Sequence, residues 1–139
     1  MKALNDKHAF SVRADAAYTT GYVAVTEVST KDCDRVVWHL DHDDDTGSGS
    51  AGALTLKVQA KNPKTPGSTA TWSDCMFLNA SAVAVQEYTI TPGADLLLAF
   101  PPGGIPVQGP AMRIAVKAAA AKGSLEVWAY KTRGTSGIG

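Results

Sequence analysis

Hydrophobic and polar residues alternate with a period of two along most of this chain. The pattern is clearest in residues 53–61, where every second residue is apolar: Leu54, Leu56, Val58 and Ala60. The residues between them are Thr55, Lys57 and Gln59. Because successive side chains of a strand point to opposite faces, this spacing predicts a strand with one buried face.

The same alternation predicts several more short strands, within residues 112–118, 125–130, 18–28, 35–41, 82–91 and 96–100, with a further edge strand at 8–13. Short strands at such regular spacing are typical of a sandwich or barrel. We therefore expect an all-β, antiparallel β-sandwich of about 7–9 strands, with a jelly-roll or immunoglobulin-like topology. The run KAAAAK at 117–122 is too short to hold a helix alone, so we interpret residues 118–124 as the connection of a C-terminal hairpin.

Glycine and proline mark the connections between these strands. We expect a polar loop at residues 41–52 and turns at 62–68 and 91–94. The segment PPGGIPVQGP, residues 101–110, is expected to be an ordered surface loop, since prolines cannot donate to a central strand. The whole chain, 1–139, is expected to be one domain with a short N-terminal arm at about 1–7 and a flexible C-terminal tail at about 134–139.

The charge and composition of the chain argue against nucleic-acid binding and against insertion into a membrane. The chain has 13 basic and 13 acidic residues and a formal net charge of zero, without the basic surplus typical of nucleic-acid binders. No apolar stretch approaches the roughly 20 residues that span a bilayer, and the start MKALNDKHAF lacks the apolar region of a secretory signal. We thus expect neither nucleic acid nor membrane as a partner. Cys33 and Cys75 are far apart in sequence, which favours two free thiols over a bridge.

The densest polar cluster lies at residues 39–45. Carboxylates at alternate positions, Asp41, Asp43 and Asp45, imitate the opening of a calcium loop, although the glycine and the closing glutamate are misplaced. His39 and His42 alone do not close a zinc site. The alternative is a solvated acidic loop at a strand end, so we assign no cofactor and keep calcium as the ion that this loop would bind.

The sequence offers no recognisable catalytic motif. No serine sits in a G-x-S-x-G elbow, no glycine-rich phosphate loop is present, and neither cysteine has a recognisable partner motif. We therefore expect a protein without catalytic residues rather than an enzyme.

The aromatic residues divide into two groups. Trp38 and Trp72 are interpreted as core residues, whereas Trp128 and Tyr130 alternate with a second apolar face and are expected at an interface. Pro101, Pro102 and Ile105 of the proline-rich loop are predicted to contribute to that interface. A competing interpretation is a carbohydrate-binding module that uses Trp72, Trp128 or Tyr130 as a stacking platform, with calcium at the acidic loop.

Two stretches carry a resemblance to a known class. They are GALTLKVQAKNPKTPGSTATWSDC, residues 52–75, and AMRIAVKAAAAKGSLEVWAYKTRG, residues 111–134. Together they resemble small β-sandwich virion proteins of tailed bacteriophages, especially capsid decoration (cement) proteins, over roughly the last two-thirds of the chain. The resemblance implies a protein of the capsid surface, made in the host cytoplasm, that bridges neighbouring shell subunits. Its implied partners are the major capsid protein and copies of itself, as a homo-oligomer such as a trimer, with termini that become ordered in the assembly.

Overall fold

The alternating segments form antiparallel strands in a computed structural model, which describes residues 9–45, 47, 49–62 and 71–133. Within those residues every regular element is a strand and no helix occurs, so the expected all-β class is confirmed. Strand β5 (Leu54–Lys61) shows the pattern most clearly, because its residues are alternately buried and half-buried from end to end. The predicted arm and tail, and most of the turn at 62–68, lie outside the described residues.

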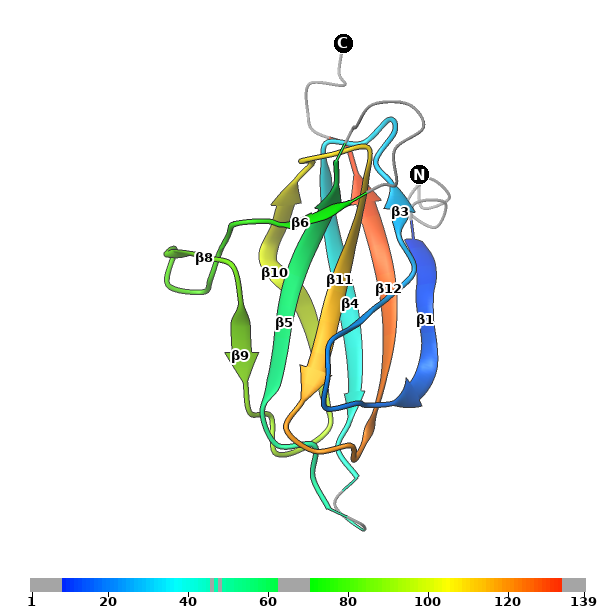
Figure 1. Ribbon diagram of the computed structural model, residues 1–139, viewed down its shortest axis with the longest axis vertical. Helices are drawn as coiled ribbons and strands as arrows, with labels where there is room; N and C mark the ends of the chain where they lie inside the picture. The colour runs from blue at the N-terminus through cyan, green and yellow to red at the C-terminus, as the bar shows by residue number, and fades with distance from the viewer. Residues whose placement is uncertain (1–8, 46, 48, 63–70, 134–139) are drawn as a thin grey trace.

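Four strands form the first sheet, which we call the four-stranded sheet. Their order is β1 (Ala9–Ala17), β12 (Ser124–Thr132), β4 (Arg35–Asp43) and β10 (Leu96–Pro106) (Figure 1). Each pairs antiparallel with its neighbour, and β1 and β10 are the two edges. The edge strand expected at 8–13 is therefore confirmed as β1, and it extends further to Ala17.

The second sheet packs against the first and is built around β11 (Ala111–Ala118) and β5. Shorter strands complete it: β2 (Val23–Ala24) and β3 (Val28–Ser29) on β11, and β6 (Trp72–Asp74) and β9 (Tyr88–Ile90) on β5. A small hairpin, β7 (Phe77–Leu78) with β8 (Ala84–Val85), projects beside the two sheets (Figure 1). We call this second layer the six-stranded sheet.

The strand order is that of a jelly roll. Consecutive long strands alternate between the sheets, because β4, β10 and β12 belong to the four-stranded sheet, and β5 and β11 to the other. The orders β1-β12-β4-β10 and β2-β11-β5-β9 place strands from the two ends of the sequence between strands from its middle. Two interleaved Greek keys of this kind define the jelly roll, one of the two topologies expected.

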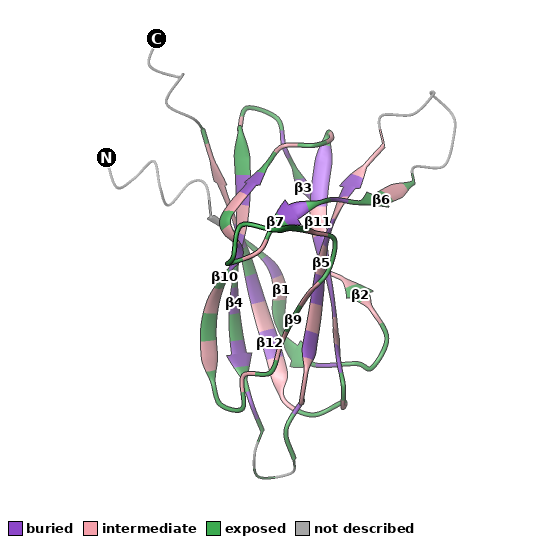
Figure 2. Ribbon diagram, turned by 90° about the vertical axis from the view of Figure 1, so that its left-hand side faces the viewer, coloured by how far each residue is buried: buried purple, intermediate pink, exposed green. Residues whose placement is uncertain are grey.

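The core lies between the facing sides of the sheets. The largest fully buried side chains come from both sheets and include Trp38, Leu54, Leu56, Ile114 and Leu125. Figure 2 shows buried residues alternating with exposed ones along the long strands. The placement of Trp38 in the core is thus confirmed, and so are the buried faces predicted for residues 53–61, 112–118 and 125–130.

Twelve strands are described, more than the predicted 7–9, because two predicted strands are each divided and the short strands β6 and β7 lie outside the predicted segments. Residues 18–28 were expected to form one strand, but only β2 and the beginning of β3 pair there. Between them the backbone bridges both sheets: the amide of Val25 donates to Ile114 O at 3.0 Å, and that of Thr26 donates to Val12 O of β1 at 3.0 Å. Residues 82–91 are divided in the same way, with β8 pairing to β7 and β9 to β5.

The prediction of a surface loop at 101–110 is wrong for its first six residues. Strand β10 continues to Pro106, and an irregularity between Phe100 and Ile105 accommodates the extra residues while Ile105 pairs with Val36. Proline is tolerated here because β10 is an edge strand with a bulge, and neither needs every backbone donor. Pro101 and Ile105 are consequently buried.

The prediction of a C-terminal hairpin is also wrong. Strands β11 and β12 lie in different sheets, so residues 119–123 cross from one layer to the other. The amides of Ala119 and Ala120 donate to Ala53 O and Ala51 O, at 2.9 and 3.0 Å. These bonds hold the connection against the residues that precede β5.

Both cysteines are free, as favoured from the sequence; Cys75 is buried and Cys33 is half-buried. No membrane-spanning helix is found in the part of the chain that the structure describes.

Candidate functional site

The outward side of the four-stranded sheet, hereafter the outer face, carries an unusual row of residues. Trp128 of β12 lies opposite His39 of β4, and His39 lies opposite Ala99 of β10. In the next row Asp41 lies between Glu126 and Leu97. Trp128 is 42% exposed and Leu97 is 77% exposed, the largest exposure among the described large hydrophobic residues. Two-residue alternation sets this arrangement, since the neighbours of these residues along each strand are directed into the core.

Two shallow grooves run along the outer face. The first, of about 370 Å³, lies between Trp128 and Leu97 and has His39 and Asp41 in its wall. The second, of about 300 Å³, is lined by Tyr130, Val37 and Arg35, and it shares His39 and Ala99 with the first. The rings of His39 and Tyr130 meet edge to face, with centroids 5.9 Å apart. The outer face is therefore a continuous strip with apolar, aromatic and ionisable groups side by side.

Charge is polarised along this strip. One end carries Asp41, Asp43 and Glu126, and Asp95 lies beside Asp43. Repulsion from Asp95, followed by partial desolvation, raises the pKa of Asp43 above its ordinary value. The other end carries Arg35, which lies opposite Thr132 and donates to the carbonyls of Gly103 and Gly104 at 3.2 Å.

The structure does not gather the three carboxylates predicted to bind calcium into one set of ligands. Asp41 and Asp43 lie exposed on the outer face, as the alternation with His39 predicts, and Asp45 is exposed in the following loop. Within the described residues, no group of three or more His, Cys, Asp or Glu side chains is arranged to hold a metal ion. Calcium binding at this loop stays a prediction.

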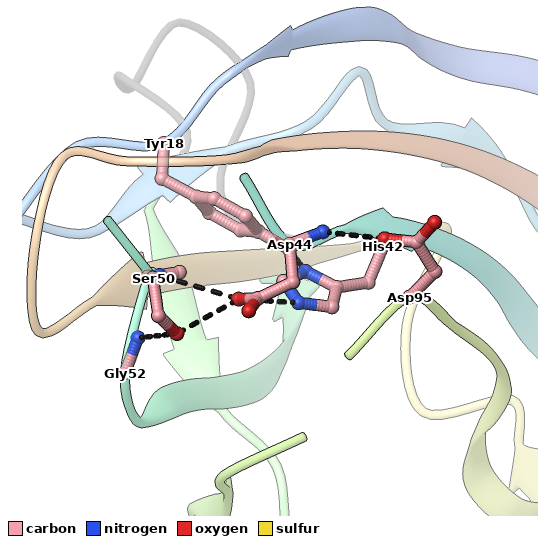
Figure 3. A network of polar contacts seen from close by, with 7 residues as sticks. Tyr18, His42, Asp44, Ser50, Gly52 and Asp95 are labelled. Carbon is pink, nitrogen blue, oxygen red and sulfur yellow. Dashed lines mark hydrogen bonds and ion pairs between the residues drawn. The ribbon is translucent and has the colours of Figure 1, made fainter. Parts of the chain in front are cut away.

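The other side of the same segment forms a buried polar network (Figure 3). The Tyr18 hydroxyl lies 2.6 Å from His42 Nδ1, and His42 Nε2 lies 3.3 Å from Asp44 Oδ1, an ion-pair distance without hydrogen-bond geometry. Asp44 Oδ1 also accepts from Ser50 Oγ at 2.9 Å and from the amide of Ala51 at 3.3 Å. Burial raises the pKa of the Tyr18 hydroxyl far above its usual range.

This network holds a loop in place and does not activate a nucleophile. The Ser50 hydroxyl donates to Asp44 and not to the His42 ring, so no serine–histidine pair forms here. His42 and Asp44 are almost inaccessible, which corrects the interpretation of this stretch as a wholly solvated acidic loop. The two-residue alternation could have indicated this burial. Val36, Trp38 and Leu40 are buried, and His42 and Asp44 continue the same spacing. The network ties the loop after β4 to the end of β1.

The residues predicted at an interface fall into two groups. Trp128, Tyr130 and Pro102 reach the surface, whereas Pro101 and Ile105 belong to the core and offer little area to a partner. Near Pro102 an apolar groove of about 380 Å³ opens beside the β7–β8 hairpin, with Met76 and Leu78 exposed at its rim. The interface itself stays a prediction.

Trp72, expected in the core, lies instead on the outward side of the six-stranded sheet. It is opposite Lys61, and the guanidinium of Arg113 lies 4.0 Å from the centroid of its ring. Arg113 in turn donates to Gln59 at 2.8 Å. Trp72 and Trp128 therefore occupy opposite sides of the sandwich and cannot form one stacking platform.

Comparison of the chain with protein-family models, curated proteins and solved structures finds no match.

Proposed function

We propose that this protein is a virion structural protein that decorates and stabilises a bacteriophage capsid by bridging neighbouring shell subunits. The contact to the shell is made by the outer face, with Trp128 as its centre. The partners in this proposal are the major capsid protein and further copies of the chain, with neither nucleic acid nor membrane involved. Its location is the capsid surface, after synthesis in the host cytoplasm.

The observation that carries the proposal is the exposed row on the outer face. The solvated side of an antiparallel sheet is normally polar. Here Trp128 and Leu97 lie on either side of β4, with His39 and Asp41 between them. Ala99 lies next to Leu97 on the same side of β10 and adds to the apolar surface there. Tryptophan is enriched among residues that dominate binding energy, because it buries a large area at little entropic cost.

The fold and the resemblance support the same role by analogy. Jelly rolls are frequent in viral capsid domains and in lectins, so the topology favours an assembly or recognition module over other classes. The segments that resemble decoration proteins, residues 52–75 and 111–134, include β5 and the two strands β11 and β12. Trp128 lies within the second of them.

Cosedimentation with shells assembled from the major capsid protein of the same genome tests the proposal. The wild-type chain is expected to bind at a fixed ratio to the shell subunits. Trp128→Ala should weaken binding by about 2 kcal/mol, roughly 30-fold. Trp72→Ala is the matched control, because it removes the same side chain from the opposite face and should leave binding within about threefold.

Failure of the wild-type chain to bind any such shell would refute the capsid role. Equal loss in both tryptophan variants, with both folded by circular dichroism, would refute the assignment to the outer face.

Carbohydrate binding is the second candidate, and one observation favours it. Trp128 shares a groove with the carboxylate of Asp41 and the ring of His39, a combination of stacking and hydrogen-bonding groups suited to a sugar. Binding on a glycan array that disappears in Trp128→Ala, together with no binding to shells, would favour this candidate over the first.

A further inference from the structure

The first half of β10 is an open, uncharged sheet edge. Strand β10 ends the four-stranded sheet, and its only strand partner among the described residues is β4 (Figure 2). Residues 96–100 read LLLAF, without charge or proline, and Leu97 is the most exposed large hydrophobic residue described. An edge strand of this kind presents unpaired backbone donors and acceptors and is a template for another strand.

The other described edges are protected. Strand β1, at the opposite edge, carries Arg13 and Asp15, has two register shifts, and receives a bond from the Thr26 amide. Strands at the margins of the six-stranded sheet are two or three residues long. Charges, irregularities and short length are the usual means by which natural sheets prevent edge pairing. Residues 96–100 have none of them.

We propose that two copies of this chain pair antiparallel through residues 96–100 of β10, making one continuous sheet of eight strands across a two-fold axis. Only apolar residues meet in such a pairing, because all five positions are uncharged. The prolines at 101, 102 and 106 and the irregularity after Phe100 confine pairing to this half of the strand. A two-fold contact closes on itself and stops at the dimer.

Charge complementarity favours a second copy in this orientation. The outer face is acidic near Asp95 and Asp43 and basic near Arg35, at opposite ends of β10 and β4. Antiparallel pairing centred near Leu98 turns the acidic end of each copy toward the basic end of the other. It also separates the two Asp95 carboxylates by about 20 Å, well beyond the screening length, given about 3.4 Å per residue. Parallel pairing would place them side by side.

The inference goes beyond the proposed function and does not depend on it. The two-fold axis is perpendicular to the continuous sheet, so both outer faces, each with its Trp128, are directed to the same side. A dimer of this form would present two identical contact strips to any repeating surface and gain from bivalent binding. It also replaces the trimer suggested by the resemblance with a closed pair.

Sedimentation equilibrium from about 1 µM to about 1 mM, with hydrogen exchange on the same samples, tests this proposal. A dimer is expected, with backbone amides within 96–100 protected more strongly as concentration rises. Leu97→Lys should weaken the dimer at least about tenfold, since it places a charge at each side of the paired edge. Val23→Lys is the matched control, because it makes the same type of change at an exposed position on β2 and should have no effect.

A chain that stays monomeric to the highest concentration, or a dimer broken by Val23→Lys and not by Leu97→Lys, would overturn the proposal. So would protection of residues 96–100 that appears only when a different protein is added. Trp128→Ala separates this inference from the proposed function, because it should weaken shell binding roughly 30-fold and leave the dimer intact. A dimer that binds no shell would therefore support the pairing while refuting the capsid role.

Discussion

Tyr18 and Tyr22 provide a direct test of how much the buried polar network stabilises the fold. Each hydroxyl makes one hydrogen bond of 2.6 Å, to His42 Nδ1 for Tyr18 and to Glu87 for Tyr22. The first bond is buried and the second is exposed to solvent. Substitution of each residue by phenylalanine removes the hydroxyl and keeps the ring. The pair of variants therefore compares the same chemical change in two environments.

The magnitude follows from what each substitution leaves behind. Tyr18→Phe leaves His42 Nδ1 without its partner in a site that water does not reach, which costs about 1–3 kcal/mol. Tyr22→Phe leaves Glu87 in water and keeps the ring beneath the ammonium groups of Lys57 and Lys117, at 4.3 and 4.7 Å from its centroid. We expect this second change to cost less than about 0.5 kcal/mol, as for most surface substitutions.

Urea denaturation measures the difference. With a slope of about 2 kcal/mol per molar, Tyr18→Phe should lower the midpoint by about 0.5–1.5 M, and Tyr22→Phe by less than about 0.3 M. Equal shifts in the two variants would refute the reasoning, because the cost would then be independent of burial. A shift for Tyr18→Phe below that for Tyr22→Phe would show that the network does not stabilise the fold.

Two further predictions concern the core. Ile105→Ala should lower the free energy of unfolding by about 2–5 kcal/mol, because Ile105 is fully buried. If this variant lost partner binding without any loss of stability, Ile105 would belong to an interface and not to the core. Burial, and then the charge of Asp74, raises the pKa of the Cys75 thiol above its ordinary 9.0, so the unfolded chain loses this proton first as pH rises. Stability should therefore fall from about pH 9 upward, less steeply in Cys75→Ala, and native Cys75 should react slowly with iodoacetamide; rapid alkylation without unfolding would contradict this.

Alternation predicted the layers of this fold well, because it is a local property. Whether Leu56 is directed inward is decided by its parity along one strand, and the sequence shows that parity directly. The same rule accounts for the common exposed face of His39, Asp41 and Asp43 on β4. It also placed Trp128 on the side opposite Leu125 and Val127, which became the centre of the candidate site.

The misplaced residues are those whose environment depends on partners distant in sequence. Pro101 was assigned to a loop because a central strand would reject it, yet nothing local showed that β10 would lie at an edge. The interpretation of Trp72 as a core residue is wrong because Arg113, about forty residues later, covers its ring on the outward side. His42 was grouped with the acidic loop because its hydrogen-bond partner, Tyr18, lies in a different segment.

Strand β4 connects the stability of the fold to the candidate site. Its even-numbered residues, including Trp38 and His42, enter the core and the buried network, while His39 and Asp41 form part of the outer face. A register shift of one residue would exchange these two sets, burying charges and exposing the tryptophan. The Tyr18–His42 contact therefore does more than stabilise a loop, because it holds one end of β4 in the register that presents the outer face. The exposed residues of β4 can form a defined binding surface only if the buried residues between them keep the strand in this register.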